Sequence, residues 1–431
     1  MTPSNDAVSG FVHTMDRDRA WFEDELLARF SRYVKVWTTS DRHSQEVPST
    51  ARQLDLSRML AAELAELGVD DVELDDRGYL LARIPASSQA LEGATPIGLM
   101  AHVDTSPDSS GENVRPQLHR AYDGGRLPLA DGVVLDPEEY PGLLAYRGET
   151  IITSDGTTLL GADDKAGIAE IMTAVSWLRD HPAFPHGPVE IIFTPDEEIG
   201  RGMDHFPKER LRARYCYTID GGDEGTVEAE CFNAYLAHVE FTGRVIHPGQ
   251  ARGKLVNAVT MAGAFLTMLP RSETPEATDG RFGFYCPVES SGDMGSAHVD
   301  VLIRDFEMHE VERRIEALRA FARAVEAGFP GGSVRVEATE QYRNMRDILQ
   351  EHPRTVAHAK EAIAETGCDP IVEIIRGGTD GSRLTQMGIP TPNIFTGAQN
   401  MHGRHEWVAL PAMVRSAKTI LNLLRRWGED D

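Results

Sequence analysis

The chain is poor in cysteine and has no long apolar run. Its 431 residues include only four cysteines, which are widely spaced and form no C-x-x-C pair: Cys216, Cys231, Cys286 and Cys368. This pattern argues against a disulfide framework or a cysteine metal cluster and favours free thiols in a reducing compartment. No stretch approaches the roughly 20 apolar residues of a membrane span. The first 19 residues are polar and lack the apolar core of a secretory signal. We therefore expect a cytoplasmic protein that makes no membrane contact.

Basic residues are also few. Lysine and arginine number 43 against 68 acidic residues, which leaves a formal net charge of −25. Such a surface repels phosphate backbones, so we expect no nucleic-acid partner. Hydrophobic residues make up 41% and charged residues 26% of the chain, as in ordinary globular proteins. A chain of this length favours two structural units rather than one core.

The pattern of apolar residues predicts an α/β protein with an insertion. Before residue 231, the spacing predicts helices over 56–67 and 163–178, a hairpin of strands 72–74 and 79–84, and buried strands 96–102 and 189–194. After residue 342, it predicts strands 371–375 and 392–395 and a closing helix that reaches Trp427. We expect a doubly wound sheet formed by a discontinuous catalytic domain, residues 1–230 and 343–431.

The intervening segment, residues 231–342, has a different order of elements. The patterns predict strands 235–243, 282–288, 297–306 and 333–342 and helices 256–269 and 310–327. The order β-α-β-β-α-β is that of a ferredoxin-like unit, which we interpret as an inserted lid. The loop at 121–137 has no predicted role. We expect the residues before Arg19 and the segment 88–95 to lie on the surface, away from any site.

Five places put residue types that bind metals at the ends of predicted strands, where open α/β sheets bind ligands. They are His102 with Asp104, the pair Asp163 and Asp164, the run Asp196 to Glu198, Asp220, and the segment from His402 to His405 and Glu406. Each one alone has a structural alternative: a solvated turn, acids that cap a helix, an acidic loop or a structural histidine. Together they supply two histidines and several carboxylates in order along one sheet, and this combination favours a metal site.

The donor set then limits the metal. Histidine mixed with carboxylate, without a cysteine cluster, suits zinc, with manganese or cobalt as substitutes. Two ions about 3.5–4 Å apart would need a carboxylate that bridges them. Water bound to such ions has a lowered pKa, so hydroxide is available near neutral pH, and a glutamate that is not a ligand can take the proton.

Several long motifs resemble the peptidase T family, tripeptide aminopeptidases within the group of two-zinc metallopeptidases that includes aminoacylases and dimetal carboxypeptidases. The segments are 101–108, 155–167, 194–200, 376–382 and 400–403. The resemblance implies five metal ligands: His102, Asp163, Glu198, Asp220 and His402. It also implies that Asp163 bridges two zinc ions, that Glu197 is the general base, that Asp104 orients His102, and that the bond between Asp163 and Asp164 is cis.

The inserted segment holds weaker candidates for substrate binding. Arg304 has the chemistry to clamp the C-terminal carboxylate of a peptide, although a salt bridge with Asp305 is the alternative. His247 resembles a lid histidine that polarises the scissile carbonyl in relatives. Asn233 lies near the hinge, where a structural amide is an equal alternative. The glycine-rich stretch 377–382 has backbone N–H groups that could face substrate. We interpret His405 and Glu406 as supports of the loop that carries His402.

The resemblance predicts an enzyme that removes the N-terminal residue from tripeptides through a metal-bound hydroxide, with Glu197 as the base. An aminoacylase or dipeptidase with the same centre is the alternative within the hydrolases. A metal-dependent peptide-binding protein without catalysis is the alternative from another class. The preferred N-terminal residue, the native metal, the resting lid position and a homodimer are left open by the sequence.

Overall fold

The computed structural model describes residues 14–15 and 17–429, and their contacts divide the chain into two compact units. The first unit contains the residues up to 229 together with 348–373 and 379–431. The second contains 230–347 and 374–378. The inserted unit therefore also includes a short segment from the C-terminal part of the chain.

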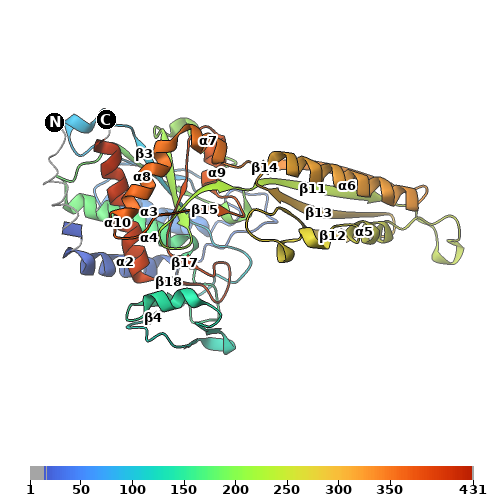
Figure 1. The fold of residues 1–431 in the computed structure, drawn as a ribbon, viewed down its shortest axis with the longest axis horizontal. Coiled ribbons are helices and arrows are strands. Elements are labelled where there is room, and N and C mark those ends of the chain that lie inside the picture. The colour runs from blue at the N-terminus through green and yellow to red at the C-terminus, as the bar shows by residue number, and fades with distance from the viewer. Residues whose placement is uncertain (1–13, 16, 430–431) are drawn as a thin grey trace. The chain divides into compact units, whose positions relative to one another are not determined.

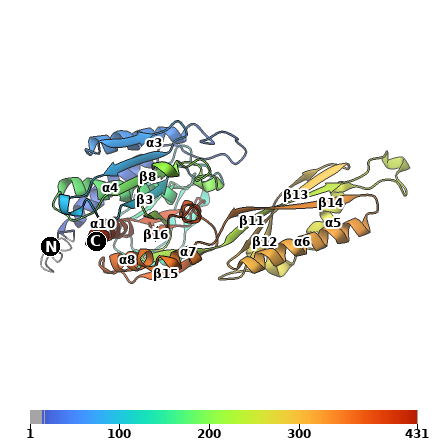
Figure 2. The same cartoon turned by 90° about the horizontal axis from the view of Figure 1, so that it is seen from above.

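The first unit is built on an eight-stranded mixed sheet (Figures 1 and 2). In spatial order its strands are β1 (Asp71–Leu74), β2 (Leu80–Ile84), β8 (Val189–Thr194), β3 (Ile97–His102), β9 (Tyr215–Gly221), β16 (Asn393–Phe395), β10 (Thr226–Cys231) and β15 (Ile371–Ile375). The central run β8-β3-β9-β16 is parallel, whereas β1 pairs antiparallel with β2, β2 with β8 and β10 with β16. The carboxyl ends of the parallel strands thus meet at one edge of the sheet.

Both faces of this sheet are covered, which explains why β3 and β8 are buried at every position and consist largely of apolar residues. One hydrophobic core contains buried side chains from five helices: α2 (Arg19–Tyr33), α3 (Gln53–Glu66), α4 (Ala162–Asp180), α8 (Pro353–Ala364) and α10 (Leu410–Glu429). A second core lies with α9 (Asp380–Gln386) on the other face. Helix α7 (Arg346–Glu351) precedes α8. The doubly wound α/β class is as predicted.

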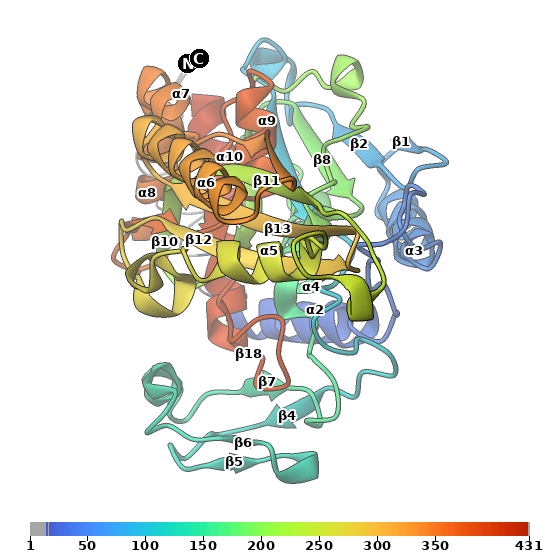
Figure 3. The ribbon, with the colours of Figure 1, turned by 90° about the vertical axis from the view of Figure 1, so that its right-hand side faces the viewer.

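Two small sheets in the first unit are not predicted by the sequence patterns. One contains β4 (Gln117–His119), β7 (Ile151–Thr153), β17 (Ala398–Gln399) and β18 (Trp407–Ala409), and the other pairs β5 (Leu127–Pro128) with β6 (Val134–Leu135) (Figure 3). The loop at 121–137 therefore forms a short hairpin. Strands of two or three residues are too short for a periodic pattern to reveal them.

The predicted surface location of the two extra segments is partly wrong. The segment 88–95 contains only a short 3-10 turn, and its side chains are mostly exposed. Met15, in contrast, is 2% exposed and belongs to the main core of the first unit. Residues 1–13 and 16 lie outside the described part of the chain.

The second unit is a four-stranded antiparallel sheet with two helices on one side (Figure 2). Its elements are β11 (Asn233–Thr242), α5 (Ala258–Leu266), β12 (Phe284–Gly292), β13 (Ser296–Asp305), α6 (Met308–Gly328) and β14 (Ser333–Tyr342). The strand order β12-β13-β11-β14 is that of the predicted ferredoxin-like unit. Alternate residues, such as Val239 and Val301, face the helices and form the core, so the intervening residues face away from it.

No helix in the described residues is long and apolar enough to cross a bilayer. None of the four cysteines, all of which lie in the described part of the chain, is in a disulfide bond, and Cys216 and Cys231 are buried.

Helix α4 carries a buried carboxyl group that makes stability depend on pH. Glu170 is fully buried, with only the Ser416 hydroxyl 2.5 Å from one oxygen, and burial raises the pKa of the Glu170 carboxyl well above its usual value. The folded chain therefore holds this proton more tightly than the unfolded chain. As the pH rises above about 4.3, this group lowers the free energy of unfolding by up to about 1.4 kcal/mol per pH unit.

We expect Glu170→Gln to be more stable than the wild type at pH 8, because the amide keeps the bond to Ser416 and has no proton to lose. Near pH 5 the difference should be much smaller. Thermal unfolding of both proteins at the two pH values measures this effect. An equal difference in Tm at both pH values would show that Glu170 does not titrate in this way.

Candidate metal centre

Two histidines from distant parts of the chain meet at the carboxylate of Asp163. His102 Nε2 lies 3.0 Å from Asp163 Oδ1, and His402 Nε2 lies 3.1 Å from Asp163 Oδ2. Each oxygen thus faces a different histidine, which is the arrangement that a carboxylate bridging two cations requires. The bond between Asp163 and Asp164 is cis, as the resemblance implied.

Further carboxylates surround the two histidines. Glu198 Oε2 lies 2.9 Å from His402 Nε2, and Asp220 Oδ1 lies 3.5 Å from His102 Nε2. Among the described residues, two groups bring three potential ligand atoms within 4.8 Å of one another: His102 with Asp163 and Glu198, and His102 with Asp164 and Asp220. The structure thus brings all five predicted ligands together and adds Asp164 as a neighbour.

One buried carboxylate oxygen that accepts no hydrogen bond from the described residues indicates that this region suits a bound cation. Glu198 Oε1 is buried and has no hydrogen-bond partner among the described residues. A buried carboxylate oxygen without a donor is costly unless a positive charge lies beside it. The donor set of imidazole nitrogens and carboxylate oxygens is one that zinc and related divalent ions accept. The residues present therefore fit a metal centre.

Local structure explains how these side chains converge. His102 and Asp220 lie at the carboxyl ends of the parallel strands β3 and β9, and Asp163 lies in the first turn of α4. Glu198 lies in a 3-10 turn that follows β8. His402 lies in the turn after β17 and has a φ of 64°, a left-handed conformation that is unusual for histidine and often found at functional sites.

Asp104 contacts both His102 and the acidic turn after β8. The carbonyl oxygen of Asp104 lies 3.1 Å from His102 Nδ1, and its carboxylate Oδ1 lies 3.4 Å from the same nitrogen. The carboxylate also accepts the backbone N–H groups of Glu197 at 3.0 Å and Glu198 at 3.2 Å. Asp104 therefore couples the histidine on β3 to the acidic turn after β8.

Glu406 contacts both the loop of His402, which we expected it to support, and a second segment. Its backbone N–H bonds to the carbonyl of Gly403 in that loop at 3.2 Å, and its carboxylate accepts the backbone N–H groups of Leu160 and Gly161, both at 2.7 Å, and of Asp163 at 3.1 Å. Glu406 is 1% exposed. The three bonds of its side chain hold the backbone that carries the carboxylate between the two histidines. The segment 155–167 and Glu406 are separately visible in the sequence, but no spacing rule links them.

Two further residues near the centre are missed by sequence reasoning. Asp108 Oδ2 lies 3.6 Å from His402 Nδ1, and Arg42 pairs with the other oxygen of Asp108 at 2.6 Å. Asp380 is buried at the start of α9 and accepts the Thr194 hydroxyl at 2.6 Å. Both aspartates lie within the motifs that resemble the family. This position in the motifs was the one feature of the sequence that could have identified them as residues of the centre.

The electrostatics of the centre reflect many carboxyls in a small buried space. Burial, with the nearby carboxylates Asp220, Asp380 and Glu198, raises the pKa of Glu197 well above its usual value. Burial is also the main cause that raises the pKa of Glu198 to about 8. Burial alone would lower the pKa of His402, but Asp163 and Glu198 raise it to about 11. This excess of negative charge is what divalent cations would neutralise.

In the glycine-rich stretch 377–382, two of the backbone N–H groups already have partners within the protein. The N–H of Thr379 bonds to the Ser382 hydroxyl at 3.2 Å, and the N–H of Ser382 bonds to the Thr379 hydroxyl at 3.4 Å. These bonds form a capping box at the start of α9. The backbone N–H groups of Thr379 and Ser382 are therefore already hydrogen-bonded at the start of α9.

In the second unit, Arg304 is a buried cation without an acidic partner. Its guanidinium donates to the carbonyl oxygens of Tyr235 and Ile303 and to Gln341 Oε1 at 2.8 Å, and the residue is 9% exposed. Among the described residues no carboxylate pairs with it. The alternative of a salt bridge with Asp305 is wrong, because Asp305 pairs with Arg314 at 2.6 Å.

The other two candidates in the second unit differ in how their polar atoms are used. His247 is exposed, and its Nδ1 accepts the N–H of Gly249 at 3.1 Å, so Nε2 carries the proton of a neutral ring and can donate it. Asn233 is buried; its amide donates to the carbonyls of Asp305 and Phe306 and accepts the N–H of Asn344. These contacts favour a structural amide at Asn233.

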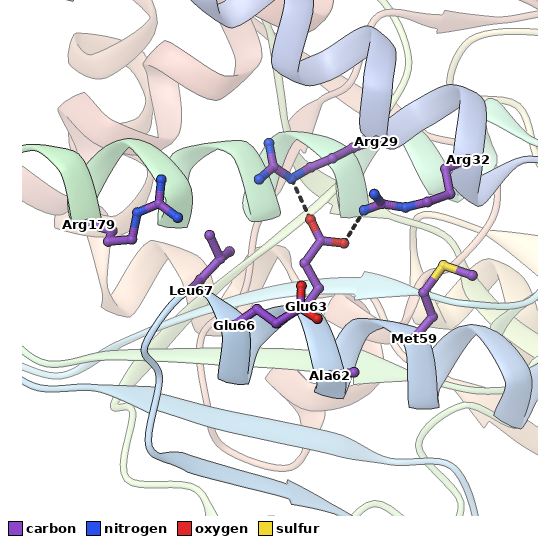
Figure 4. Close-up of a pocket in the computed structure, with 8 residues that line it drawn as sticks. All are labelled: Arg29, Arg32, Met59, Ala62, Glu63, Glu66, Leu67 and Arg179. Atoms are coloured by element: carbon purple, nitrogen blue, oxygen red, sulfur yellow. Dashed lines mark hydrogen bonds and ion pairs between the residues drawn. The ribbon is translucent and has the colours of Figure 1, made fainter.

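A pocket elsewhere in the first unit contains none of the predicted site residues. It has a volume of about 510 Å³ between α2, α3 and the end of α4 (Figure 4). Glu63 lies between Arg29 and Arg32 and pairs with both guanidiniums (Figure 4). Arg179, at the end of α4, pairs with Asp180. Because these charges are paired within the protein, the pocket gives no indication of a ligand.

Comparison with known proteins agrees with the geometry. The model of a family described as Peptidase family M20/M25/M40 matches residues 143–426. A peptidase T from Bacillus velezensis is 45% identical over 409 residues, which cover 94% of this chain and 99% of that protein. A peptidase T from Shewanella sediminis is also 45% identical, over 405 residues that cover 94% and 98% of the two chains.

Solved structures share the fold. A tripeptidase from Staphylococcus aureus superposes with a TM-score of 0.74 at 20% identity, covering 94% of this chain and 98% of that one. A dinuclear metal-binding peptidase from Bacillus subtilis superposes with a TM-score of 0.62 at 14% identity and the same coverage. The family match and the relatives at 45% identity lead to one conclusion: the chain belongs to peptidase family M20/M25/M40 and, within it, to the peptidase T family.

Proposed function

We propose that this peptidase is a metal-dependent aminopeptidase that releases the N-terminal residue from tripeptides. The observation that carries the proposal is the Asp163 carboxylate, with one oxygen at each of two histidines. The peptidase T relatives support the substrate class. We further propose that the first unit is the catalytic domain and that the second is a lid.

In this proposal His102, Asp163, Glu198, Asp220 and His402 would hold two zinc ions, and the two oxygens of Asp163 each face one of the two histidines. Cobalt or manganese would substitute. When bound, the ions would act as Lewis acids and would lower the pKa of a bound water molecule. The histidines and carboxylates of the chain would hold the ions in place, and Asp104 would orient His102 through the ring nitrogen Nδ1.

Glu197 is the residue that we assign to proton transfer. Its Oε2 lies 4.0 Å from His102 Nε2, next to the proposed ligands, and its backbone is held by Asp104. Among the described residues none donates a hydrogen bond to the Glu197 carboxylate. It is therefore available to take a proton from water and to return it to the leaving amine.

The proposal is tested with metal-stripped and zinc-restored protein. We expect stripped protein to hydrolyse free tripeptides at background rate, restored protein to recover full activity, and tripeptides with a blocked N-terminus to resist hydrolysis throughout. A panel of dipeptides, tripeptides, tetrapeptides and N-acylated amino acids separates the related activities. Preference for N-acylated substrates would replace the proposal with an aminoacylase, and bound metal without any hydrolysis would replace it with a peptide-binding protein.

We propose that Arg304 binds the C-terminal carboxylate of the peptide. This role is supported by the contacts of its guanidinium, which has no acidic partner among the described residues of its own unit. We expect Arg304→Ala to lower kcat/KM for a tripeptide by about tenfold to a hundredfold, the loss expected for a charge-assisted hydrogen bond. Hydrolysis of the same tripeptide with an amidated C-terminus should change little. Arg319→Ala, which removes an exposed arginine of α6, is the matched control. Equal losses on both substrates would exclude this role.

His247 and Asn233 remain predictions for substrate contact, with the exposed ring of His247 the better supported. A homodimer is likewise a prediction that sedimentation velocity would test. We propose a cytoplasmic location, which is supported by four cysteines that form no disulfide bond among the described residues.

A further inference from the structure

A second group of metal-binding residue types lies on the sheet of the second unit, on the face away from α5 and α6. In the pairing of β11 with β13, His238 is opposite Asp300 and Glu240 is opposite His298. On β12, Glu289 pairs with Asp300 and Ser291 with His298. Because alternate residues share one face of a strand, these side chains all project from the same side of the sheet.

The side chains in this group already contact one another. His238 Nδ1 lies 2.5 Å from Asp300 Oδ1, and the rings of His238 and His298 have their centroids 5.3 Å apart. His238 Nε2 lies 3.7 Å from Glu240 Oε1, and His298 Nε2 lies 4.0 Å from Glu289 Oε1. Two imidazoles and three carboxylates therefore lie side by side across β11, β13 and β12, each in contact with a neighbour in the group.

The composition of this group distinguishes it from an ordinary charged surface. Exposed ion pairs contribute little to stability, so packing or folding does not explain why two histidines lie diagonally across neighbouring strands among carboxylates. A pair of imidazoles with carboxylates beside them is a common donor set for transition metals. The carboxylates also lower the cost of bringing a divalent cation to this face.

We propose that His238 and His298, together with Asp300 and either Glu289 or Glu240, bind a divalent transition-metal ion such as zinc. None of these residues is a proposed ligand of the centre around Asp163, and all of them belong to the second unit. The histidine side chains are 39% and 33% exposed, so their rings can turn toward one ion. Since the ligands are not arranged around one point beforehand, the site binds more weakly than the centre of the first unit.

The metal preference of the site follows from its donors. Imidazole nitrogens favour copper, nickel and zinc, whereas calcium and magnesium prefer oxygen ligands alone. Zinc, nickel and copper should therefore compete for the site, and millimolar magnesium should leave bound zinc in place.

The test counts zinc ions per chain by equilibrium dialysis in buffered zinc for wild type, for the double variant His238→Ala/His298→Ala, and for His309→Ala. His309 is a 73% exposed histidine of the same unit and serves as the matched control. We expect the double variant to bind one ion fewer than the wild type and His309→Ala to bind the same number as the wild type. Because this result is a difference, it does not depend on how many ions the first unit holds or on aminopeptidase activity.

A second measurement covers the case in which the double variant folds poorly. Copper is added to zinc-loaded protein, and electron paramagnetic resonance reports the nitrogens bound to each copper ion. We expect coupling to two imidazole nitrogens in the wild type and to one in the single variant His298→Ala, whose side chain is on the surface. Equal zinc counts in the wild type and the double variant, a loss of the ion in His309→Ala, or unchanged copper coupling in His298→Ala would overturn the proposal.

Discussion

Glu197→Gln is expected to lower kcat for tripeptide hydrolysis by a factor of about 10² to 10⁴ while leaving the bound metal in place. The amide has nearly the same shape as the carboxylate but cannot take a proton from water. The backbone N–H of Glu197 still bonds to Asp104, so the turn after β8 keeps its structure. Steady-state kinetics at saturating tripeptide, with metal content measured on the same samples, checks both parts of the expectation.

Glu198→Gln provides the contrast for this experiment. Glu198 Oε2 lies 2.9 Å from His402 Nε2, so this side chain is placed as a ligand rather than as a base. We expect Glu198→Gln to lose metal affinity together with activity, and added zinc to restore part of the activity. If Glu197→Gln behaved in the same way, or if it kept wild-type kcat, the assignment of Glu197 as the general base would be wrong.

Glu406→Gln is expected to weaken metal binding by a factor of about 10 to 100, although Glu406 touches no metal in the proposed site. The carboxylate accepts three backbone N–H groups, of Leu160, Gly161 and Asp163. An amide replaces one of these two acceptor oxygens with an NH₂ group, which then points at an N–H donor. The segment that positions the Asp163 carboxylate should shift, and both histidines lose their common neighbour.

Zinc affinity measured by competition with a chelator of known strength tests this prediction, with thermal unfolding as a check on the fold. Glu170→Gln is the matched control, because it also converts a buried carboxyl to an amide but lies outside the site and bonds only to Ser416. We expect the control to keep wild-type zinc affinity. A Glu406→Gln protein with unchanged affinity would show that the backbone of 160–163 is held in place without this carboxylate.

Much of the fold is present in local patterns of the sequence. The strands β3 and β8 consist largely of apolar residues because both faces of the central sheet are covered. The inserted unit keeps its β-α-β-β-α-β order because each of its strands and helices is long enough to show a period. The strands β4 to β7, with two or three residues each, have no such pattern, and neighbours in the sheet rather than local sequence define them.

The sequence by itself determined the types of chemical group at the centre: the predicted ligands His102, Asp163, Glu198, Asp220 and His402 all meet at the carboxyl ends of the sheet. Only the tertiary structure decided how they are held. Glu406 reaches Asp163 across 243 residues of sequence, and Asp104 reaches Glu197 across 93. The histidines of the second unit meet Asp300 and Glu289 only through strand pairing. Motifs record which groups are present, whereas contacts between distant segments depend on the register and packing of the folded chain.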